Sequence, residues 1–140
     1  MIFSTEISIS TKGSTDVIDI TGEVENILKK SKVMEGLVTV SMPGSTGAIT
    51  TIEYEPGVIN DLKDALDAIA PRDKEYAHDA KWGDGNGYSH IRSALVGTSK
   101  SFPVAGGRVS LGTWQQIVFI DFDNRPRQRK IIVQVLGEKA

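Results

Sequence analysis

The sequence contains no cysteine, which excludes disulfides, thiolate nucleophiles and cysteine-based metal sites. Its net charge is only −2 at pH 7, so there is no electrostatic case for binding nucleic acid or an anionic membrane. No apolar run approaches the roughly 18 residues of a membrane span. The first residues also lack the basic and apolar segments of a signal peptide. These absences lead us to expect a cytoplasmic protein with no nucleic-acid or membrane partner.

The remaining composition is that of an ordinary globular protein, with 39% hydrophobic and 24% charged residues. A chain of 140 residues suits a single domain, which we place at residues 1–140. Alternating apolar and polar residues, or runs rich in β-branched residues between turn signals, predict strands over residues 2–10, 15–20, 37–42, 48–54, 101–104, 108–111, 114–122 and 129–136. Both faces of the strand at 114–122 carry apolar residues, so we expect both faces to be covered.

Apolar residues at helical spacing predict two main helices, one from Thr21 and one from Pro56 to Pro71. A short helix is expected from Ser89 to Val96, and Thr21 and Ser89 are expected to cap their helices. Successive hairpins, including one formed by residues 2–20, imply mostly antiparallel pairing. We therefore predict an α+β fold with an antiparallel, β-sandwich-like core and a long loop at residues 71–88.

The chain has only two histidines, His78 beside Asp79 and His90 near the start of the short helix. Neutral imidazole and carboxylate groups suit Zn²⁺ or a similar divalent ion. His78, Asp79 and His90 therefore form a candidate metal site, and Mg²⁺ is the other cation considered. The eleven intervening residues match no compact helical ligand motif, so two ordinary polar histidines are the alternative.

A second group of residues has the chemistry of a phosphate site. An arginine side chain forks onto phosphate oxygens, and hydroxyls with helix-end N–H groups complete such a site. The members of this group are Arg92, Ser93, Thr98, Ser99 and Lys100. Ser45 and Thr46, in an earlier proline-glycine turn, can add to the same cradle. The alternative is a solvated, capped helix without a ligand.

Other polar positions are weaker candidates. Thr113 and Gln115, in Gly112–Gln116, can reach a ligand or a neighbouring subunit, or can form the polar face of an edge strand. The carboxylates of Glu53, Glu55 and Asp61 are more typical of surface charge. The last set is basic and is better explained as a solvated turn: Arg125, Arg127, Arg129 and Lys130.

Three segments together resemble the YjbQ-like family, whose members are often described as secondary thiamine-phosphate synthases. They are Gly-Tyr-Ser-His-Ile-Arg-Ser-Ala-Leu-Val-Gly-Thr-Ser at 87–99, Gly-Arg-Val-Ser-Leu-Gly-Thr-Trp-Gln-Gln at 107–116, and Arg-Pro-Arg-Gln-Arg-Lys at 125–130. The resemblance implies a small α+β fold that assembles as a homotrimer. It also implies a site that includes His78 and His90. Many members carry a further histidine in a segment that matches Met42–Gly47, and this sequence lacks it.

The activity that the resemblance implies joins a pyrimidine methyl pyrophosphate to a thiazole phosphate and releases pyrophosphate. Such a substitution needs cations and N–H donors around the leaving group. We accordingly expect catalytic roles for His78, His90 and Arg92, and substrate contacts from Ser93, Thr98, Ser99, Thr113 and Gln115. The competing hypothesis is a non-catalytic trimer that binds an anionic metabolite or a metal.

Overall fold

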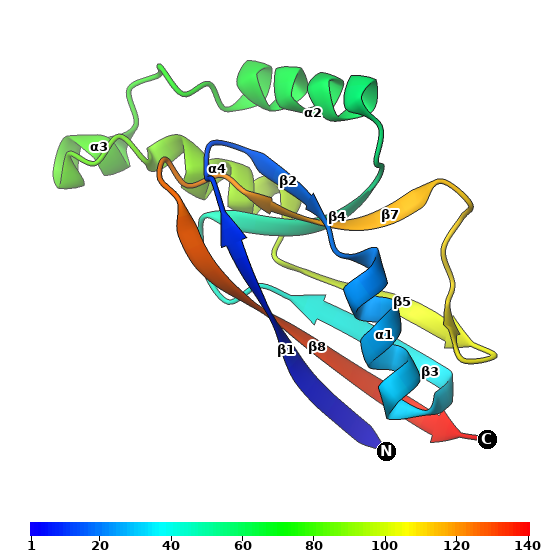
Figure 1. Cartoon of the computed structure of the whole chain (residues 1–140). Helices are drawn as coiled ribbons and strands as arrows, with labels where there is room; N and C mark the ends of the chain where they lie inside the picture. The colour runs from blue at the N-terminus through cyan, green and yellow to red at the C-terminus, as the bar shows by residue number, and fades with distance from the viewer.

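The chain folds into two antiparallel sheets and four helices (Figure 1). The computed structural model describes residues 1–140. The five-stranded sheet contains, in spatial order, β1 (Ile2–Thr11), β8 (Arg127–Lys139), β3 (Val33–Ser41), β5 (Ser99–Ala105) and β6 (Arg108–Val109). The three-stranded sheet contains β2 (Asp16–Asp19), β7 (Gln115–Asp121) and β4 (Gly47–Glu53). Every strand pair is antiparallel, which confirms the predicted α+β class.

The first and last strands lie side by side in the five-stranded sheet. β1 pairs with β8 from Ile2 opposite Leu136 to Thr11 opposite Arg127, so both ends of the chain emerge together (Figure 1). Inward-facing β8 residues are fully buried, as at Ile131 and Val133, whereas the intervening residues are half-buried or exposed. This alternation is that of a sheet with one covered face.

β7 is the most deeply buried strand, because both of its faces are covered. Ile117 and Phe119 belong to a cluster of 18 buried residues between the two sheets and under α1 (Thr21–Ser31). Val118 and Ile120 belong to a second cluster on the opposite face. The predicted two-sided burial of this strand is confirmed, and each such apolar side chain contributes about 1.5–3 kcal/mol to folding.

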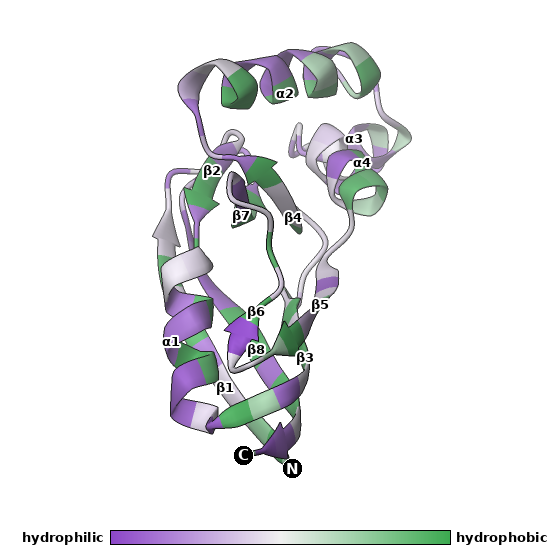
Figure 2. Cartoon of the chain, turned by 90° about the vertical axis from the view of Figure 1, so that its right-hand side faces the viewer, coloured by the Kyte–Doolittle hydropathy of each residue, from purple (hydrophilic) through white to green (hydrophobic).

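The second cluster is covered by α2 (Pro56–Ile69), which forms the layer outside the three-stranded sheet (Figure 2). Leu66 is its buried residue, and Leu62 packs beside it. The helix begins as predicted, with Pro56 in its first turn. Glu55 provides the cap, since its carboxylate accepts hydrogen bonds from two N–H groups of that turn.

The expected hairpin at residues 2–20 is wrong. β1 pairs with β8 in one sheet and β2 pairs with β7 in the other, so the intervening turn carries the chain between sheets. Gly13 must lie there without a side chain, because a Cβ would come 2.4 Å from the carbonyl oxygen of Arg125. Of the successive strands, only β5 and β6 form a hairpin, and Gly106 and Gly107 turn it with positive φ.

The helices also differ from the prediction in number and in their caps. Residues 71–88 contain α3 (Ala77–Trp82), and α4 (Gly87–Val96) begins before the expected Ser89. The six residues of α3, Ala-His-Asp-Ala-Lys-Trp, are too few to show apolar periodicity, which is why the sequence pattern missed this helix. Thr21 lies inside α1, where its own N–H and hydroxyl bond the Asp19 carboxylate. No helix has the length and apolar character needed to cross a membrane.

Candidate functional site

The two histidines, twelve positions apart, lie against one another. His78 on α3 and His90 on α4 have ring centroids 4.5 Å apart, with their planes tilted by 45°. The two helices approach closely because α4 begins at a glycine: a Cβ on Gly87 would lie 2.6 Å from the Cβ of Tyr76. Any larger residue at this position would push the helices, and the histidines, apart.

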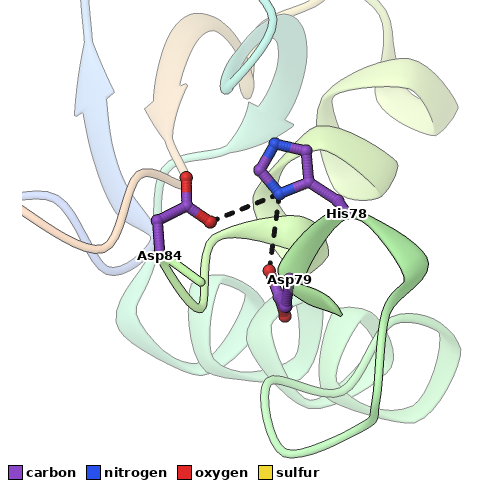
Figure 3. Close-up of side chains that lie close together, drawn as sticks. All are labelled: His78, Asp79 and Asp84. Carbon is purple, nitrogen blue, oxygen red and sulfur yellow. Dashed lines mark hydrogen bonds and ion pairs between the residues drawn. The ribbon is translucent and has the colours of Figure 1, made fainter. Parts of the chain in front are cut away.

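Two carboxylates face the His78 ring (Figure 3). Nδ1 of His78 is 3.3 Å from an Asp84 oxygen and 3.4 Å from an Asp79 oxygen. The same Asp79 oxygen accepts the Gly87 N–H at 2.9 Å, and that of Asp84 accepts the Asn86 N–H at 3.2 Å. These bonds hold both carboxylates in place within residues 71–88, the segment predicted as a long loop.

One ligand atom from each of His78, Asp79 and Asp84 lies within 4.8 Å of the other two. The predicted metal site consisted of His78, Asp79 and His90. In the structure Asp84 completes the group, and His90 contacts the ring of His78 instead. One nitrogen and two oxygen donors suit Zn²⁺, Mn²⁺ or Mg²⁺, and three protein ligands leave positions for water or substrate.

His90 also lines a pocket of about 270 Å³ between α4 and the turn that precedes β4. Gly44 and Ser45 come from that turn, and Thr98 comes from the segment after α4. The two segments are joined by backbone hydrogen bonds, including one of 2.8 Å from the Met42 N–H to the Thr98 carbonyl. The structure therefore brings two predicted hydroxyl residues beside His90.

Ser93 contributes to this pocket while anchoring its wall. Its hydroxyl is buried and donates a 2.6 Å hydrogen bond to the Gly47 carbonyl. Ser99 lies apart from the pocket residues, at the exposed start of β5. Lys100 donates to the carbonyl of Val96 at 2.9 Å and so caps the end of α4.

Arg92 points away from the histidines. Positions 90 and 92 are about 200° apart around a helix, so their side chains lie on opposite sides of α4. Arg92 is 3% exposed. It donates hydrogen bonds to the Ala70 carbonyl, the Thr15 hydroxyl and the Asp67 carboxylate at 3.0, 3.0 and 2.7 Å. In the structure this predicted catalytic residue joins α4 to the end of α2 and to the β1–β2 turn.

Thr113 and Gln115 line a separate cleft of about 660 Å³ between α1 and the β6–β7 connection. None of its lining residues lines the His90 pocket. Gln115 accepts the Gly112 N–H at 3.0 Å and donates to Thr51 at 3.2 Å, so its amide helps to fold its own loop. The structure does not bring these two predicted substrate contacts to the histidines.

Comparison with known proteins gives a family for this arrangement. The family model described as "UPF0047 protein YjbQ-like" matches residues 5–138. The chain belongs to the YjbQ-like family. Relatives in the family include a UPF0047 protein of Methanothermobacter thermautotrophicus, 36% identical over 98% of this chain and 94% of that protein. The Bacillus subtilis protein YugU is 34% identical over 94% and 97% of the two chains.

Solved structures of YjbQ-like proteins agree with the fold. A Sulfolobus solfataricus protein described as of unknown function superposes with a TM-score of 0.93, at 30% identity and 99% coverage of both chains. A Clostridium acetobutylicum protein of the YjbQ/UPF0047 family has a TM-score of 0.87, at 35% identity over 94% of this chain and 99% of its own. The resemblance noted from the sequence is therefore confirmed for family and fold.

Met42–Gly47, the segment for which the resemblance led us to expect a further histidine, is the turn beside His90. Gly44 of this segment lines the His90 pocket, so the segment faces the His90 imidazole. Here the pocket instead presents the Ser45 hydroxyl and open space. The ligand set that the present residues provide is His78 with Asp79 and Asp84, and His90 packs against the His78 ring.

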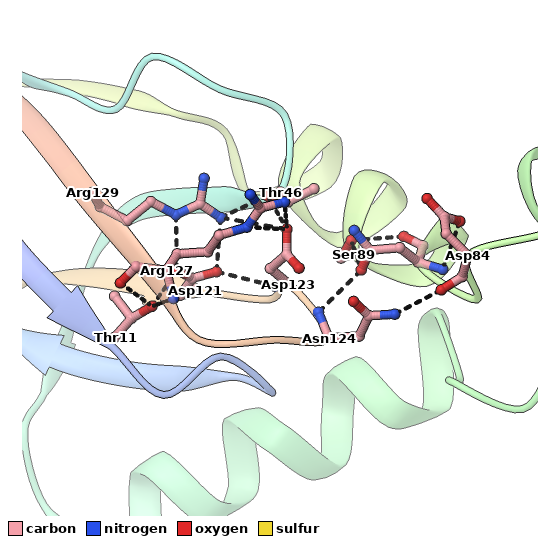
Figure 4. Close-up of polar contacts among 10 residues, drawn as sticks. Thr11, Thr46, Asp84, Ser89, Asp121, Asp123, Asn124, Arg127 and Arg129 are labelled. Atoms are coloured by element: carbon pink, nitrogen blue, oxygen red, sulfur yellow. Dashed lines mark hydrogen bonds and ion pairs between the residues drawn. The ribbon is translucent and has the colours of Figure 1, made fainter. Parts of the chain in front are cut away.

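The sequence analysis missed a buried ionic network next to the site (Figure 4). Asp121 and Asp123 are fully buried at the end of β7. Arg129 donates to both Asp121 oxygens at 2.8 and 2.9 Å, and Arg127 donates twice to Asp123 at 2.9 and 3.1 Å. The interpretation of these arginines as a solvated turn is wrong, because the acids that precede them are buried and paired. The sequence did contain a signal for this network, because Asp121 and Asp123 stand at the end of a strongly apolar strand.

The ionisation of this network is settled by its hydrogen bonds. Burial by itself raises the pKa of Asp121, but hydrogen bonds from Arg129, Thr11 and the Asp123 N–H together hold that pKa below its ordinary value. The hydrogen bond to Asp121 in turn raises the pKa of Arg129. Both groups are charged at neutral pH, so the turn that follows β7 rests on a stable ion pair.

The network reaches both parts of the candidate site. Arg129 donates to the Thr46 hydroxyl at 2.7 Å and so fixes the turn that faces His90. The amide of Asn124 donates to the Asp84 carbonyl at 2.8 Å, and its N–H donates to the Asn86 side chain at 3.1 Å. The loop of Asp84 and the turn of Ser45 are therefore held by two nearby residues, Asn124 in the β7–β8 connection and Arg129 on β8.

Proposed function

We propose that this protein is an enzyme that acts on a phosphorylated or pyrophosphorylated small molecule at the paired histidines. The observation that carries the proposal is the contact between His78 and His90, one facing two carboxylates and the other a hydroxyl-lined pocket. Titratable groups gathered at a concave, half-exposed place are typical of active sites. The same arrangement has no evident role in packing the core.

The pocket suits the charged end of such a substrate. His90 can donate an imidazole N–H, Ser45 and Thr98 can donate hydroxyls, and all three line one small cavity. These donors are placed to receive the negative charge that develops on a departing phosphate or pyrophosphate. His78 supports His90 through ring contact and is itself oriented by Asp79 and Asp84.

The residues present fit a divalent cation, which we place on His78, Asp79 and Asp84. Such an ion would neutralise charge on the phosphoryl oxygens of the substrate. The carboxylates keep their orientation through the N–H groups of Gly87 and Asn86. Arg92 acts in this proposal as a positioning residue, since its bonds set where α4 places His90.

Within this class, the reaction that the family resemblance favours is thiamine-phosphate synthesis. The thiazole nitrogen forms a bond to the pyrimidine methylene carbon, and the C–O bond to pyrophosphate breaks with its electron pair leaving on oxygen. We further propose a cytoplasmic homotrimer. An exposed apolar row on the five-stranded sheet supports self-association: Ile2 lies opposite Leu136, and Leu136 lies opposite Leu37.

The test is pyrophosphate release from the two thiamine precursors by purified wild-type protein and by His78→Ala, His90→Ala and Gln128→Ala. We expect a loss of about 10²–10³-fold in kcat for the histidine variants, as for removal of a donor that stabilises developing negative charge. The exposed Gln128 on β8 serves as the control and should leave the rate unchanged. Unchanged rates in both folded histidine variants would remove the proposal.

A second candidate is a metal-binding protein without catalysis, which the group of His78, Asp79 and Asp84 favours. Titration of the metal-free protein with Zn²⁺, Mn²⁺ and Mg²⁺ tests it by calorimetry. Stoichiometric binding that Asp84→Asn weakens, in a protein that turns over no phosphorylated substrate, would support this candidate. Turnover that disappears in His90→Ala would exclude it.

A further inference from the structure

A small cationic cavity lies on the side of α4 away from His90. It has a volume of about 150 Å³ and is enclosed by the β1–β2 turn, α2 and α4. Three cations face it, Lys63, Arg72 and Arg92, against the single carboxylate of Asp67. The local charge is therefore +2 in a chain whose total charge is −2. This excess of positive charge favours the binding of an anion in the cavity.

The cations have donors to spare. Arg92 uses one hydrogen on each of its three nitrogens, which leaves two of its five N–H groups for a ligand. Arg72 makes one hydrogen bond, of 3.3 Å to the Ser14 hydroxyl. The half-buried Lys63 makes no ion pair within the chain. Keeping the buried Arg92 guanidinium, with unused donors, next to the unpaired Lys63 ammonium costs free energy unless a bound anion accepts hydrogen bonds from both groups.

The backbone at one wall of the cavity is strained. Ser14 and Thr15 follow Gly13 with φ of 54° and 62°, in the left-handed region that a β-branched residue avoids. Their hydroxyls accept hydrogen bonds from the two arginines of the cavity, Ser14 from Arg72 and Thr15 from Arg92. Strain of this kind gathers at ligand sites, where it holds side chains in a binding geometry.

A buried aromatic ring orients the two guanidinium groups. The Tyr88 side chain is 1% exposed, and the guanidinium carbons of Arg72 and Arg92 lie 5.2 and 5.0 Å from its ring centroid. Stacking of this type fixes the plane of an arginine and therefore the direction of its donors. The cavity thus has preset cations, hydroxyls and a rigid floor, which are the components of an oxyanion site.

We propose that this cavity binds a phosphate-type oxyanion, either free inorganic phosphate or the terminal phosphate of a small molecule. Bidentate donation by arginine matches the tetrahedral oxygens, and Lys63 supplies the remaining charge. The site is independent of the proposed reaction, because its residues are not those that line the His90 pocket. The same helix carries both sites, through His90 on one side and Arg92 on the other.

The experiment is calorimetric titration of inorganic phosphate at low ionic strength into wild-type protein, Lys63→Gln, Arg72→Gln and His90→Ala. Lys30→Gln is the matched control, because Lys30 is an exposed lysine on α1 outside the cavity. We expect saturable binding to the wild type, the control and His90→Ala. In Lys63→Gln and in Arg72→Gln we expect Kd to rise about tenfold or more, as for loss of one charged contact.

Parallel titrations with methyl phosphate and phenyl phosphate distinguish the two sources. Tightest binding of inorganic phosphate assigns the free ion, and tighter binding of an ester assigns the phosphate of a larger molecule. No saturable binding of any of the three to the wild type would overturn the site. Binding that His90→Ala abolishes and Lys63→Gln leaves intact would also overturn it, while supporting an anion site at the histidines.

Discussion

Asp121 provides the most direct test of what holds the candidate site together. Its carboxylate is fully buried and accepts two hydrogen bonds from Arg129, one from the Thr11 hydroxyl and one from the Asp123 N–H. Asp121→Asn keeps the shape of the side chain but removes the charge that pairs with Arg129. The guanidinium, with 13% of its side chain exposed, is then left largely without water, and its remaining counter-ion is Asp123, which lies 3.8 Å away and is already paired with Arg127.

The expected cost follows from that burial. Breaking a buried ion pair by removing one partner costs about 3–5 kcal/mol. The asparagine can still accept one hydrogen bond, so we expect the lower end, about 3 kcal/mol. At about 2.1 cal/mol/K per residue, unfolding a 140-residue chain carries an entropy of about 0.3 kcal/mol/K. The melting temperature should therefore fall by about 10 °C.

The measurement is thermal unfolding at pH 7 by circular dichroism, with Glu6→Gln as the control. Glu6 on β1 pairs at 3.8 Å with Lys130 on β8, the strand that also carries Arg129, but the side chains of Glu6 and Lys130 are both exposed. Exposed pairs contribute about 0–1 kcal/mol, so the control should shift the melting temperature by at most a few degrees. Equal shifts in the two variants would refute the argument from burial.

The pH dependence gives an independent check. Because the folded pKa of Asp121 lies below its ordinary value of 3.8, the charged carboxylate stabilises the fold at every pH above that value. This stabilisation is lost as the pH falls from about 4 through the lower folded pKa. The Asn variant has no carboxylate to protonate, so its stability should decline less steeply below pH 4. Parallel profiles for wild type and variant would contradict the assigned ionisation.

Two further predictions concern the helices that carry the site. Gly87→Ala places a Cβ 2.6 Å from that of Tyr76, so it should cost about 1–3 kcal/mol, and it should weaken metal binding because the same Cβ lies 3.1 Å from the Asp79 oxygen. Gly22→Ala is its control: nothing lies within 4 Å of that position in α1, so this variant should be neutral or more stable, and an equal loss in both would contradict the clash. Glu55→Ala removes both 2.8 Å cap bonds of α2, so the Gly57 and Val58 amides should exchange with deuterium faster. Those bonds lower the pKa of Glu55, so the protection of these two amides in the wild type should persist above pH 4.5 and decrease as the pH falls below that value. An unchanged exchange rate in Glu55→Ala would show that the cap is unimportant.

The parts of the fold that could be predicted from the sequence are those decided by local pattern. Apolar residues on both faces of β7 indicated that both faces are covered, and Ile117 and Val118 do belong to different hydrophobic clusters. Apolar spacing together with Pro56 located α2. In each case the side chains that face the core recur at the period of the element, so neighbouring residues carry the whole signal.

The parts that could not be predicted depend on partners far along the chain. β1 pairs with β8 across more than a hundred residues, and the nearby β2 enters another sheet. Nothing in residues 2–20 distinguishes that route from a hairpin except the three successive positive φ angles at 13–15, which are known only once the structure is. Likewise, Arg129 is recognisable as buried only after β8 is placed beside Asp121.

The site shows the same division between local and long-range information. Sequence chemistry selected the histidines, Asp79 and the two hydroxyl residues near His90, because their side-chain types are informative alone. It also joined Arg92 to His90, since the two are neighbours in the sequence. On a helix, however, a separation of two reverses direction, whereas a separation of three or four preserves it.

Because of this reversal, different sides of α4 face different cavities. Arg92 and Tyr88 lie four residues apart and face the cationic cavity, while His90 and Ala94 face the pocket with Ser45. Ser89 and Ser93 are buried, and their hydroxyls donate to backbone carbonyls at 2.7 and 2.6 Å. The helix is therefore anchored along its buried side, while its two other sides carry the residues of the cationic cavity and of the His90 pocket. The hydrogen bonds of Arg92 then fix the same rigid body that places His90 against His78, so an arginine that never reaches the pocket still determines its geometry.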